Sequence, residues 1–177
     1  MARVPYVTEE DHPELADLID RFKAGRRGSL INIYRTLLNS PALAETWFTH
    51  ANTVRWKTEL PGRLRELVII RVASITGGAY MLRQHVPKLA LAEGVSEAEC
   101  AALADWQGSA LFAPAERAAL AYADAMTRDV NVPDDVFEAL RPHYSDRQIV
   151  ELTVLIASYN MLTRILQALR VDLEPAS

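Results

Sequence analysis

One long apolar segment, LPGRLRELVIIRVASITGG at residues 60–78, constrains the fold more than any other feature of the chain. Its apolar residues fall on nearly every side of a helix: Leu64, Leu67, Val68, Ile70, Val72 and Ile75. A helix that is apolar all round is buried inside a protein. Pro61 favours a helix start, and the glycines at 77 and 78 favour its end. The segment therefore predicts a central helix around which other elements pack.

Caps and breakers divide the first part of the chain into further helices. Asp11 and Glu14 have the spacing of a capping box, which predicts a helix over residues 14–25. Apolar residues recur at helical spacing over residues 29–40, and Pro41 then favours a new helix over residues 41–58. Three helices are thus expected before the central one.

The second part of the chain has the same organisation. A helix is expected over residues 80–93, with Gly94 as its C-terminal cap. Ser96 with Glu99, and Ser145 with Gln148, have capping-box spacing, while two prolines favour helix starts, Pro114 and Pro133. No run alternates polar and apolar residues, so we predict an all-α fold.

The length of 177 residues suits one domain with a substantial core. We expect residues 1–28 to form an N-terminal extension and helix, and residues 60–95 a helical pair. A net charge of −4 offers no broad cationic surface for nucleic acid or a membrane surface. The N-terminal residues lack the apolar centre of a secretory signal, which predicts a cytoplasmic protein. The single cysteine, Cys100, excludes a Cys-x-x-Cys pair.

Chemistry-bearing residues gather in GGAYMLRQH, residues 77–85. On a helix, Gly78, Met81 and His85 lie within about 60° of one another, and Tyr80 lies to one side. Glu66 on the central helix is placed to reach the space beside the glycines. The spacing predicts that a carboxylate, a phenol and an imidazole converge.

This pattern resembles the central motif of the carboxymuconolactone decarboxylase and alkylhydroperoxidase D (AhpD) superfamily. In that motif a glutamate precedes Cys-x-Tyr-Cys-x-x-x-His, with the first cysteine twelve positions later. Glu66, Tyr80 and His85 match the residue types of the motif, whereas Gly78 and Met81 stand at the two cysteine positions. The likeness extends more weakly over most of the chain from about residue 30. It implies an AhpD-like helical bundle that forms a homo-oligomer, a trimer or hexamer, through apolar helices.

The two missing cysteines change the activity that the resemblance implies. Peroxide reduction by that route needs a thiolate and a resolving thiol, which glycine and methionine cannot supply. Acid/base chemistry on a small organic acid or lactone needs neither thiol nor cofactor. We therefore expect a cofactor-independent lyase, with decarboxylation, elimination and isomerisation all open.

Roles for the motif residues follow from their types. His85 is the expected general acid or base, Glu66 its orienting partner or itself a base, and Tyr80 a donor to a developing oxyanion. Gly78 is expected to leave room for a substrate beside Met81. The other candidate substrate-binding residues are three arginines and one asparagine: Arg71, Arg83, Arg164 and Asn160.

Each assignment has a structural alternative. His85 is also compatible with a hydrogen-bonded core histidine, and Glu66 with an ion pair to Arg63 or Arg71. Tyr80 and Met81 are compatible with core packing. The residues Asn160 and Arg164 are equally suited to holding helices together at a subunit contact.

Two other functions stay open from the sequence. One is a noncatalytic helical assembly or small-ligand-binding protein, and the other is an antioxidant using Cys100. No His-x-x-x-His or Glu-x-x-His pair is present, so we expect no metal. Nucleotide-binding and serine-hydrolase motifs are also missing from the sequence, and the expected partner is a small-molecule substrate.

Overall fold

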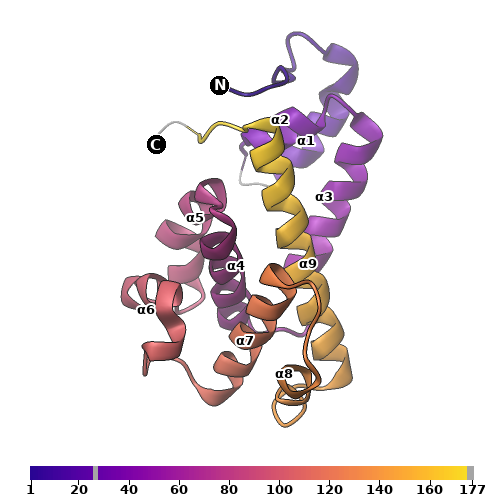
Figure 1. The fold of residues 1–177 in the computed structure, drawn as a ribbon. Helices are drawn as coiled ribbons and strands as arrows, with labels where there is room; N and C mark the ends of the chain where they lie inside the picture. The colour runs from indigo at the N-terminus through magenta and orange to yellow at the C-terminus, as the bar shows by residue number, and fades with distance from the viewer. Residues whose placement is uncertain (26–27, 175–177) are drawn as a thin grey trace. The chain divides into compact units, whose positions relative to one another are not determined.

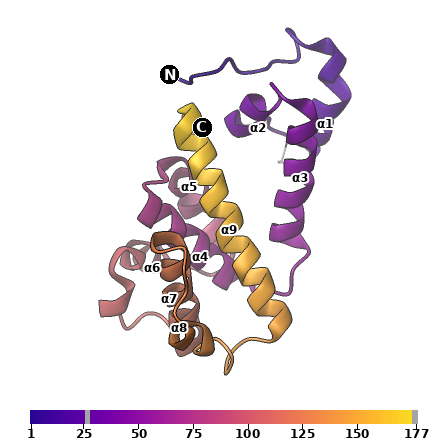
Figure 2. The same ribbon diagram turned by 45° about the vertical axis from the view of Figure 1, so that its right-hand side comes forward.

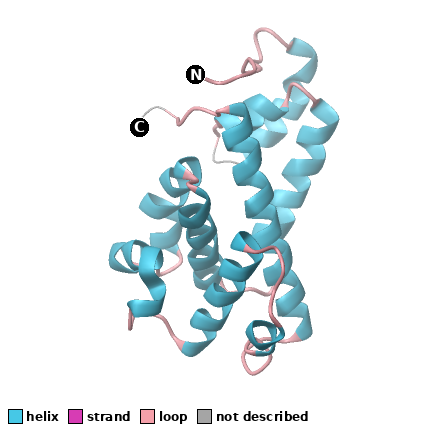
Figure 3. Ribbon diagram, in the orientation of Figure 1, coloured by secondary structure: helices cyan, strands magenta, loops and turns pink. Residues whose placement is uncertain are grey.

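The computed structural model describes residues 1–25 and 28–174, and the regular elements among them are all helices (Figure 3). This confirms the predicted all-α class. The chain divides into two compact units, Met1–Thr53 with Ile165–Ser177, and Val54–Arg164.

The first unit contains the 3-10 turn η1 (Pro13–Leu15), α1 (Ala16–Ala24), α2 (Asn32–Leu37) and most of α3 (Pro41–Trp56). Figure 2 shows α1 and α2 close to the start of α3. Three aromatic rings join these helices, because Phe22 stacks on Phe48 and both rings contact Tyr34. The expected Asp11–Glu14 capping box is wrong: the Asp11 carboxylate accepts a hydrogen bond from the Thr8 hydroxyl, and no side chain caps η1 or α1.

The second unit is built around α4 (Gly62–Thr76), as the apolar pattern predicts. Helix α4 contacts α5 (Ala79–Gln84), the π-helix η2 (His85–Ala90), the 3-10 helix η3 (Leu103–Gly108) and α7 (Pro114–Arg128), and Figure 1 shows it between α5 and α7. The unit is completed by α6 (Glu97–Ala102), α8 (Asp134–Glu138) and most of α9 (Asp146–Leu169).

Glycines end helices where the sequence predicts. Gly77 is the C-cap of α4 and has a φ of 66°, a left-handed conformation that glycine adopts without steric cost. Gly94 likewise has a φ of 78°. Both capping boxes of the second unit, Ser96–Glu99 and Ser145–Gln148, form as predicted.

The expected single helix over residues 80–93 is wrong in its middle. The chain forms α5 as far as Gln84 and then widens into the π-helix η2, which starts at His85. Pro87 lies inside η2 and has no N–H to donate to the preceding turn, which disfavours a continuous α-helix. Such π segments are frequent at functional sites.

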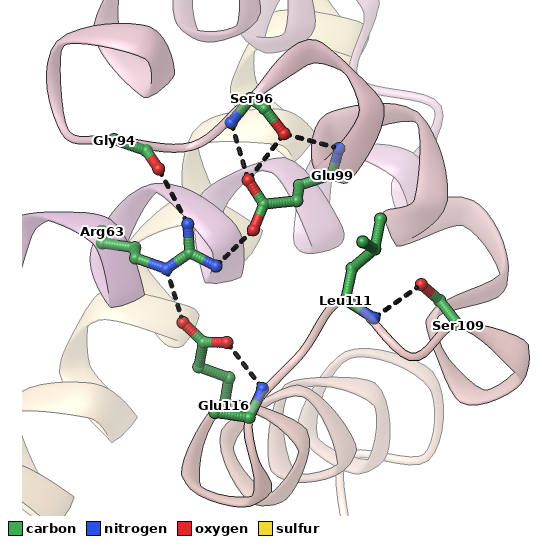
Figure 4. Close-up of polar contacts among 8 residues, drawn as sticks. Arg63, Gly94, Ser96, Glu99, Ser109, Leu111 and Glu116 are labelled. Atoms are coloured by element: carbon green, nitrogen blue, oxygen red, sulfur yellow. Dashed lines mark hydrogen bonds and ion pairs between the residues drawn. The ribbon is translucent and has the colours of Figure 1, made fainter.

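An ion cluster around Arg63 fastens the start of α4 (Figure 4). Its guanidinium donates Nε to Glu116 at 2.7 Å, Nη2 to Glu99 at 2.5 Å and Nη1 to the carbonyl of Gly94 at 2.8 Å. Glu99 also accepts hydrogen bonds from Ser96 at the start of α6. This Arg63 cluster therefore connects the first turn of α4 to the first turns of α6 and α7.

Helix α9 has the length and apolar composition of a helix that crosses a membrane. Half of its apolar window is buried inside the protein, as in the core helix of a folded domain. It is the one helix in residues 1–25 and 28–174 with these properties.

Candidate functional site

The centre of the candidate site is a hydrogen bond between Glu66 and His85. Glu66 lies on α4 with no exposed surface, and His85 begins η2 with 6% of its surface exposed. The Nδ1 atom of His85 lies 2.6 Å from Oε2 of Glu66. The structure therefore brings together the carboxylate and the imidazole that the motif spacing suggests.

A buried arginine, Arg55, joins this pair. Its Nη2 donates to Oε1 of Glu66 at 3.0 Å, and its Nη1 donates to the hydroxyl of Tyr159 at 3.1 Å. The same Nη1 lies 3.4 Å from Nε2 of His85. The Tyr159 ring meets the imidazole edge to face, with 5.6 Å between ring centroids. We call these four side chains the Glu66 cluster.

The environment sets the charges of the Glu66 cluster. Burial lowers the pKa of His85 below 6.5, and the nearby charge of Arg55 acts in the same direction, against the opposing effect of Glu66. Burial tends to raise the pKa of Glu66, but the hydrogen bond from His85 and the charge of Arg55 outweigh it and lower that pKa. At neutral pH the cluster holds an anionic carboxylate, a neutral imidazole and a cationic guanidinium.

These charges assign the histidine tautomer. An anionic carboxylate only accepts hydrogen bonds, so Nδ1 of His85 carries the proton. The lone pair then lies on Nε2 and faces Nη1 of Arg55 at 3.4 Å, the longest contact of the cluster. This arrangement has a base in Nε2, an anion behind it and a cation beside it.

The other motif positions are packed. Tyr80 is buried on α5, and Sδ of the buried Met81 accepts a hydrogen bond from Thr163. A Cβ added to Gly78 would lie 3.0 Å from the Met81 methyl group and 3.3 Å from Cα of Ala73. The expected free space at Gly78 is therefore filled by neighbouring atoms.

The candidate arginines on α4 and α5 have different surroundings. Arg71 is buried and donates Nε and Nη2 to the two carboxylate oxygens of Asp124, both at 2.6 Å, and Nη1 to the carbonyls of Leu103 and Ala104. Its guanidinium is thereby committed to a structural ion pair. Arg83 is exposed on α5.

Asn160 and Arg164 contact each other on α9. Nη1 of Arg164 donates to the side-chain oxygen of Asn160 at 2.8 Å, and Nδ2 of Asn160 donates to Thr127 on α7 at 2.9 Å. The Asn160 side chain thus joins α9 to α7 within the second unit.

The lone cysteine lies apart from the motif. Cys100 belongs to an apolar cluster that includes Leu67 and Trp106, and burial raises the pKa of its thiol. A buried, protonated thiol is a poor nucleophile. Within residues 1–25 and 28–174, no three His, Cys, Asp or Glu side chains gather as potential metal ligands.

Arg55 and Tyr159 belong to the cluster but are not among the candidate residues predicted from the sequence. Arg55 precedes Glu66 by eleven positions on a different helix, so helical spacing does not relate the two residues. The only local signal is an arginine beside Trp56 at the end of a predicted helix. Such a signal does not distinguish a site residue from a surface residue.

Comparisons with known proteins agree with this fold and motif. Residues 41–125 match the model of the carboxymuconolactone decarboxylase family. The crystal structure of ATU0492, a protein of unknown function from Agrobacterium tumefaciens, is 31% identical, with a TM-score of 0.74, and the match covers 80% of this chain and 97% of that one.

Two more distant structures share the fold. An AhpD-core, peroxidase-related protein from Ralstonia eutropha JMP134 has a TM-score of 0.82 at 18% identity, with coverage of 98% of this chain and 92% of that one. A cysteine-to-alanine variant of the debrominase Bmp8, in complex with 2,3,4-tribromopyrrole, has a TM-score of 0.81 at 23% identity, with coverage of 98% and 94%. The chain has an AhpD-like fold without a Cys-x-x-Cys pair, and it belongs to the carboxymuconolactone decarboxylase family.

Proposed function

We propose that this protein is a cofactor-independent acid/base enzyme that acts on a small organic acid or lactone. The supporting observation is the 2.6 Å hydrogen bond from His85 to the buried Glu66, with Arg55 on the other side of the imidazole. A neutral imidazole held by an anion is a competent base near neutral pH.

Each group has a defined part in this proposal. Nε2 of His85 accepts a proton from a carbon next to a carbonyl, and Glu66 stabilises the imidazolium that forms. The electron pair of the broken C–H bond moves into an enolate, whose oxygen receives a hydrogen bond from Arg55. In a decarboxylation of a carboxylate borne on that carbon, the electron pair of the C–C bond enters the same enolate as CO2 leaves, and a proton from solvent, relayed through Nε2 of His85, is then added to the carbon.

The proposal excludes thiol-dependent peroxide reduction. That chemistry needs two cooperating thiols, whereas this chain has only Cys100. We therefore do not propose for this chain the activities in the names of its structural neighbours, peroxidase-related protein and debrominase.

Hydrogen–deuterium exchange tests the proposal without a known product. A carboxylated γ-lactone, 5-oxotetrahydrofuran-2-carboxylate, is incubated with the protein in D2O, and ¹H NMR follows exchange of the hydrogens on the carbon next to the carbonyl. We expect His85→Gln to lower the rate about 10²–10⁴-fold. The matched control is His143→Gln, because His143 is exposed in a turn. Equal rates in both variants would contradict a catalytic His85.

A noncatalytic ligand-binding protein is the second candidate, because the groups of the Glu66 cluster already satisfy one another in the folded chain. In this case the lactone binds to the wild-type protein but its hydrogens next to the carbonyl do not exchange. Binding by calorimetry beside the exchange assay separates the two candidates.

We also propose a homo-oligomer, as the family resemblance implies. Between residues 146 and 164, α9 exposes Val150, Val154 and Met161, which are four and seven positions apart and so share one face. Exposed apolar faces of this kind are typical of subunit contacts. Light scattering should report a smaller mass for Val154→Asp than for the wild type, and an unchanged mass would contradict this contact.

A further inference from the structure

Arg65 is a buried arginine with an incomplete set of partners. Only 6% of its surface is exposed, and its Nη2 donates to Oε1 of Glu93 at 3.0 Å. Its Nε is buried without any hydrogen-bond partner, and no other side-chain nitrogen or oxygen buried in the described part of the chain shares this condition. Native proteins almost always satisfy such groups, so an orphaned donor indicates a missing acceptor.

The missing acceptor can be identified by comparison with Arg71. There, the Nε and Nη2 atoms face both oxygens of Asp124, which is the two-pronged geometry that a guanidinium offers a carboxylate. On Arg65 the same edge is half occupied, because Glu93 contacts Nη2 and leaves Nε unpaired. The vacant donor therefore suits one oxygen of a carboxylate.

The surroundings of this edge connect it to the Glu66 cluster. Trp56 is 56% exposed, and its ring lies 4.8 Å from the guanidinium carbon of Arg55 and 5.3 Å from that of Arg65. The charge of Arg65 also helps to lower the pKa values of Glu66 and His85, after the larger effects of burial and of their mutual contact. The two arginines thus share one aromatic ring, and one of them, Arg55, contacts the imidazole.

Glu93 is placed to be replaced by a ligand. Its side chain is 33% exposed, more than the 7% of the Arg65 side chain, so it can turn towards solvent while Arg65 stays in place. Its carboxylate also lies against Gly62, at a point where any Cβ would collide with it. The chain thus already holds a carboxylate against this edge, through one oxygen only.

We propose that the Nε–Nη2 edge of Arg65 binds the carboxylate of a small organic-acid ligand, that Glu93 is the group displaced, and that Trp56 covers the bound carboxylate. This rests on the proposed function and deepens it, since it assigns the ligand a carboxylate. The ligand is then held beside the Trp56 ring that Arg65 shares with Arg55, at a site that the earlier candidates Arg71, Arg83 and Arg164 do not form.

Calorimetric binding of a matched ligand pair tests this site. The probes are 5-oxotetrahydrofuran-2-carboxylate and its uncharged counterpart γ-butyrolactone, titrated into the wild type and three variants. We expect Arg65→Lys to weaken binding of the carboxylate about tenfold, because lysine keeps the charge but loses the two-pronged geometry. Glu93→Gln should tighten binding severalfold, because a neutral amide competes less for Arg65. Arg128→Gln, at an exposed arginine at the end of α7, is the control and should bind like the wild type.

The two substitutions are expected to change the affinity in opposite directions, which distinguishes a ligand site from a structural ion pair. A merely structural Arg65–Glu93 pair predicts that both substitutions lower thermal stability and that neither tightens binding. Failure of the wild type to bind the carboxylate, unchanged affinity in Glu93→Gln, or equal effects on both lactones would each overturn the proposal.

The same titrations, combined with the exchange assay on the wild type, separate this site from the proposed reaction. Binding that follows the predicted order, without exchange by the wild type, would support the Arg65 site and reject the enzyme. Turnover by the wild type, with a KM unchanged by Arg65→Lys and Glu93→Gln, would support the enzyme and reject this site.

Discussion

The first part of α4 carries the central residues of two ion clusters, Arg63 and Glu66, which are three positions apart in the sequence. The two clusters differ in how their hydrogen-bond donors and acceptors are paired. In the Arg63 cluster every guanidinium nitrogen has its own acceptor, and two of the acceptors are carboxylates that bind helix starts (Figure 4). Glu99 is so well stabilised by Arg63 that its pKa falls to about 2. All of its charges are used in joining secondary structure.

In the Glu66 cluster, by contrast, two guanidinium nitrogens of Arg55 serve three acceptors, because Nη1 is shared between Tyr159 and His85, and the cluster contains a neutral imidazole. One of those contacts, from Arg55 to Nε2 of His85, is long at 3.4 Å. A lone pair that is held weakly is available to another proton. The difference shows that the arrangement of acceptors, rather than the presence of charge, distinguishes a structural cluster from a chemically competent one.

The largest expected effect comes from breaking the Glu66 cluster. Glu66→Ala leaves the charge of Arg55 buried without its carboxylate, and we expect a loss of about 3–5 kcal/mol in the free energy of unfolding. The double variant Glu66→Leu with Arg55→Met should recover most of this loss, because it removes both charges. Urea denaturation measures both values. A double variant as unstable as the single one would contradict the ion-pair explanation.

Breaking the Arg63 cluster should have a smaller effect and no chemical consequence. Arg63→Met is expected to lower the free energy of unfolding by about 1.5–3 kcal/mol, since the two carboxylates keep partial access to water and their capping hydrogen bonds. Urea denaturation measures the loss, and NMR titration of the His85 imidazole should give the wild-type pKa. A shifted imidazole titration would show that the two clusters are coupled.

The smallest expected effect is on the pH dependence of stability, which should differ between the two clusters. The pKa of His85 is lower in the folded than in the unfolded chain, so its contribution to stability is full above pH 6.5 and is lost as the pH falls. The contribution of Glu99 is full above pH 4.5 and is lost as the pH falls towards 2. Denaturation across this range should show the first loss abolished in His85→Gln and the second in Glu99→Gln. The reverse assignment would refute the two environments described above.

Local chemistry explains why most helices are predictable from the sequence. The Ser96–Glu99 and Ser145–Gln148 boxes, the proline at the start of α7 and the glycine after α4 each act within one turn. The predicted capping box at Asp11 does not form, because the Thr8 hydroxyl donates a hydrogen bond to the same carboxylate. A spacing rule identifies a suitable cap but not its competitors.

The candidate site is only partly predictable, for a related reason. Glu66 and His85 lie on either side of the turn between α4 and α5, so their approach follows from the motif. The approach of Arg55 depends on how the end of α3 packs against α4 within the second unit, and no spacing in the sequence encodes this. The ion pair of Arg71 with Asp124 depends on packing between α4 and α7 in the same way.

The wide turn at His85–Ala90 has a consequence for protein engineering. A π-helix accommodates about one extra residue per turn, so residues after it are rotated from their places on a continuous α-helix. If residues 79–93 were transplanted onto an ideal α-helix, the order of the side chains would be kept. The direction of the Glu93 carboxylate relative to the His85 imidazole would change. A design that borrows this segment must borrow its irregular backbone as well.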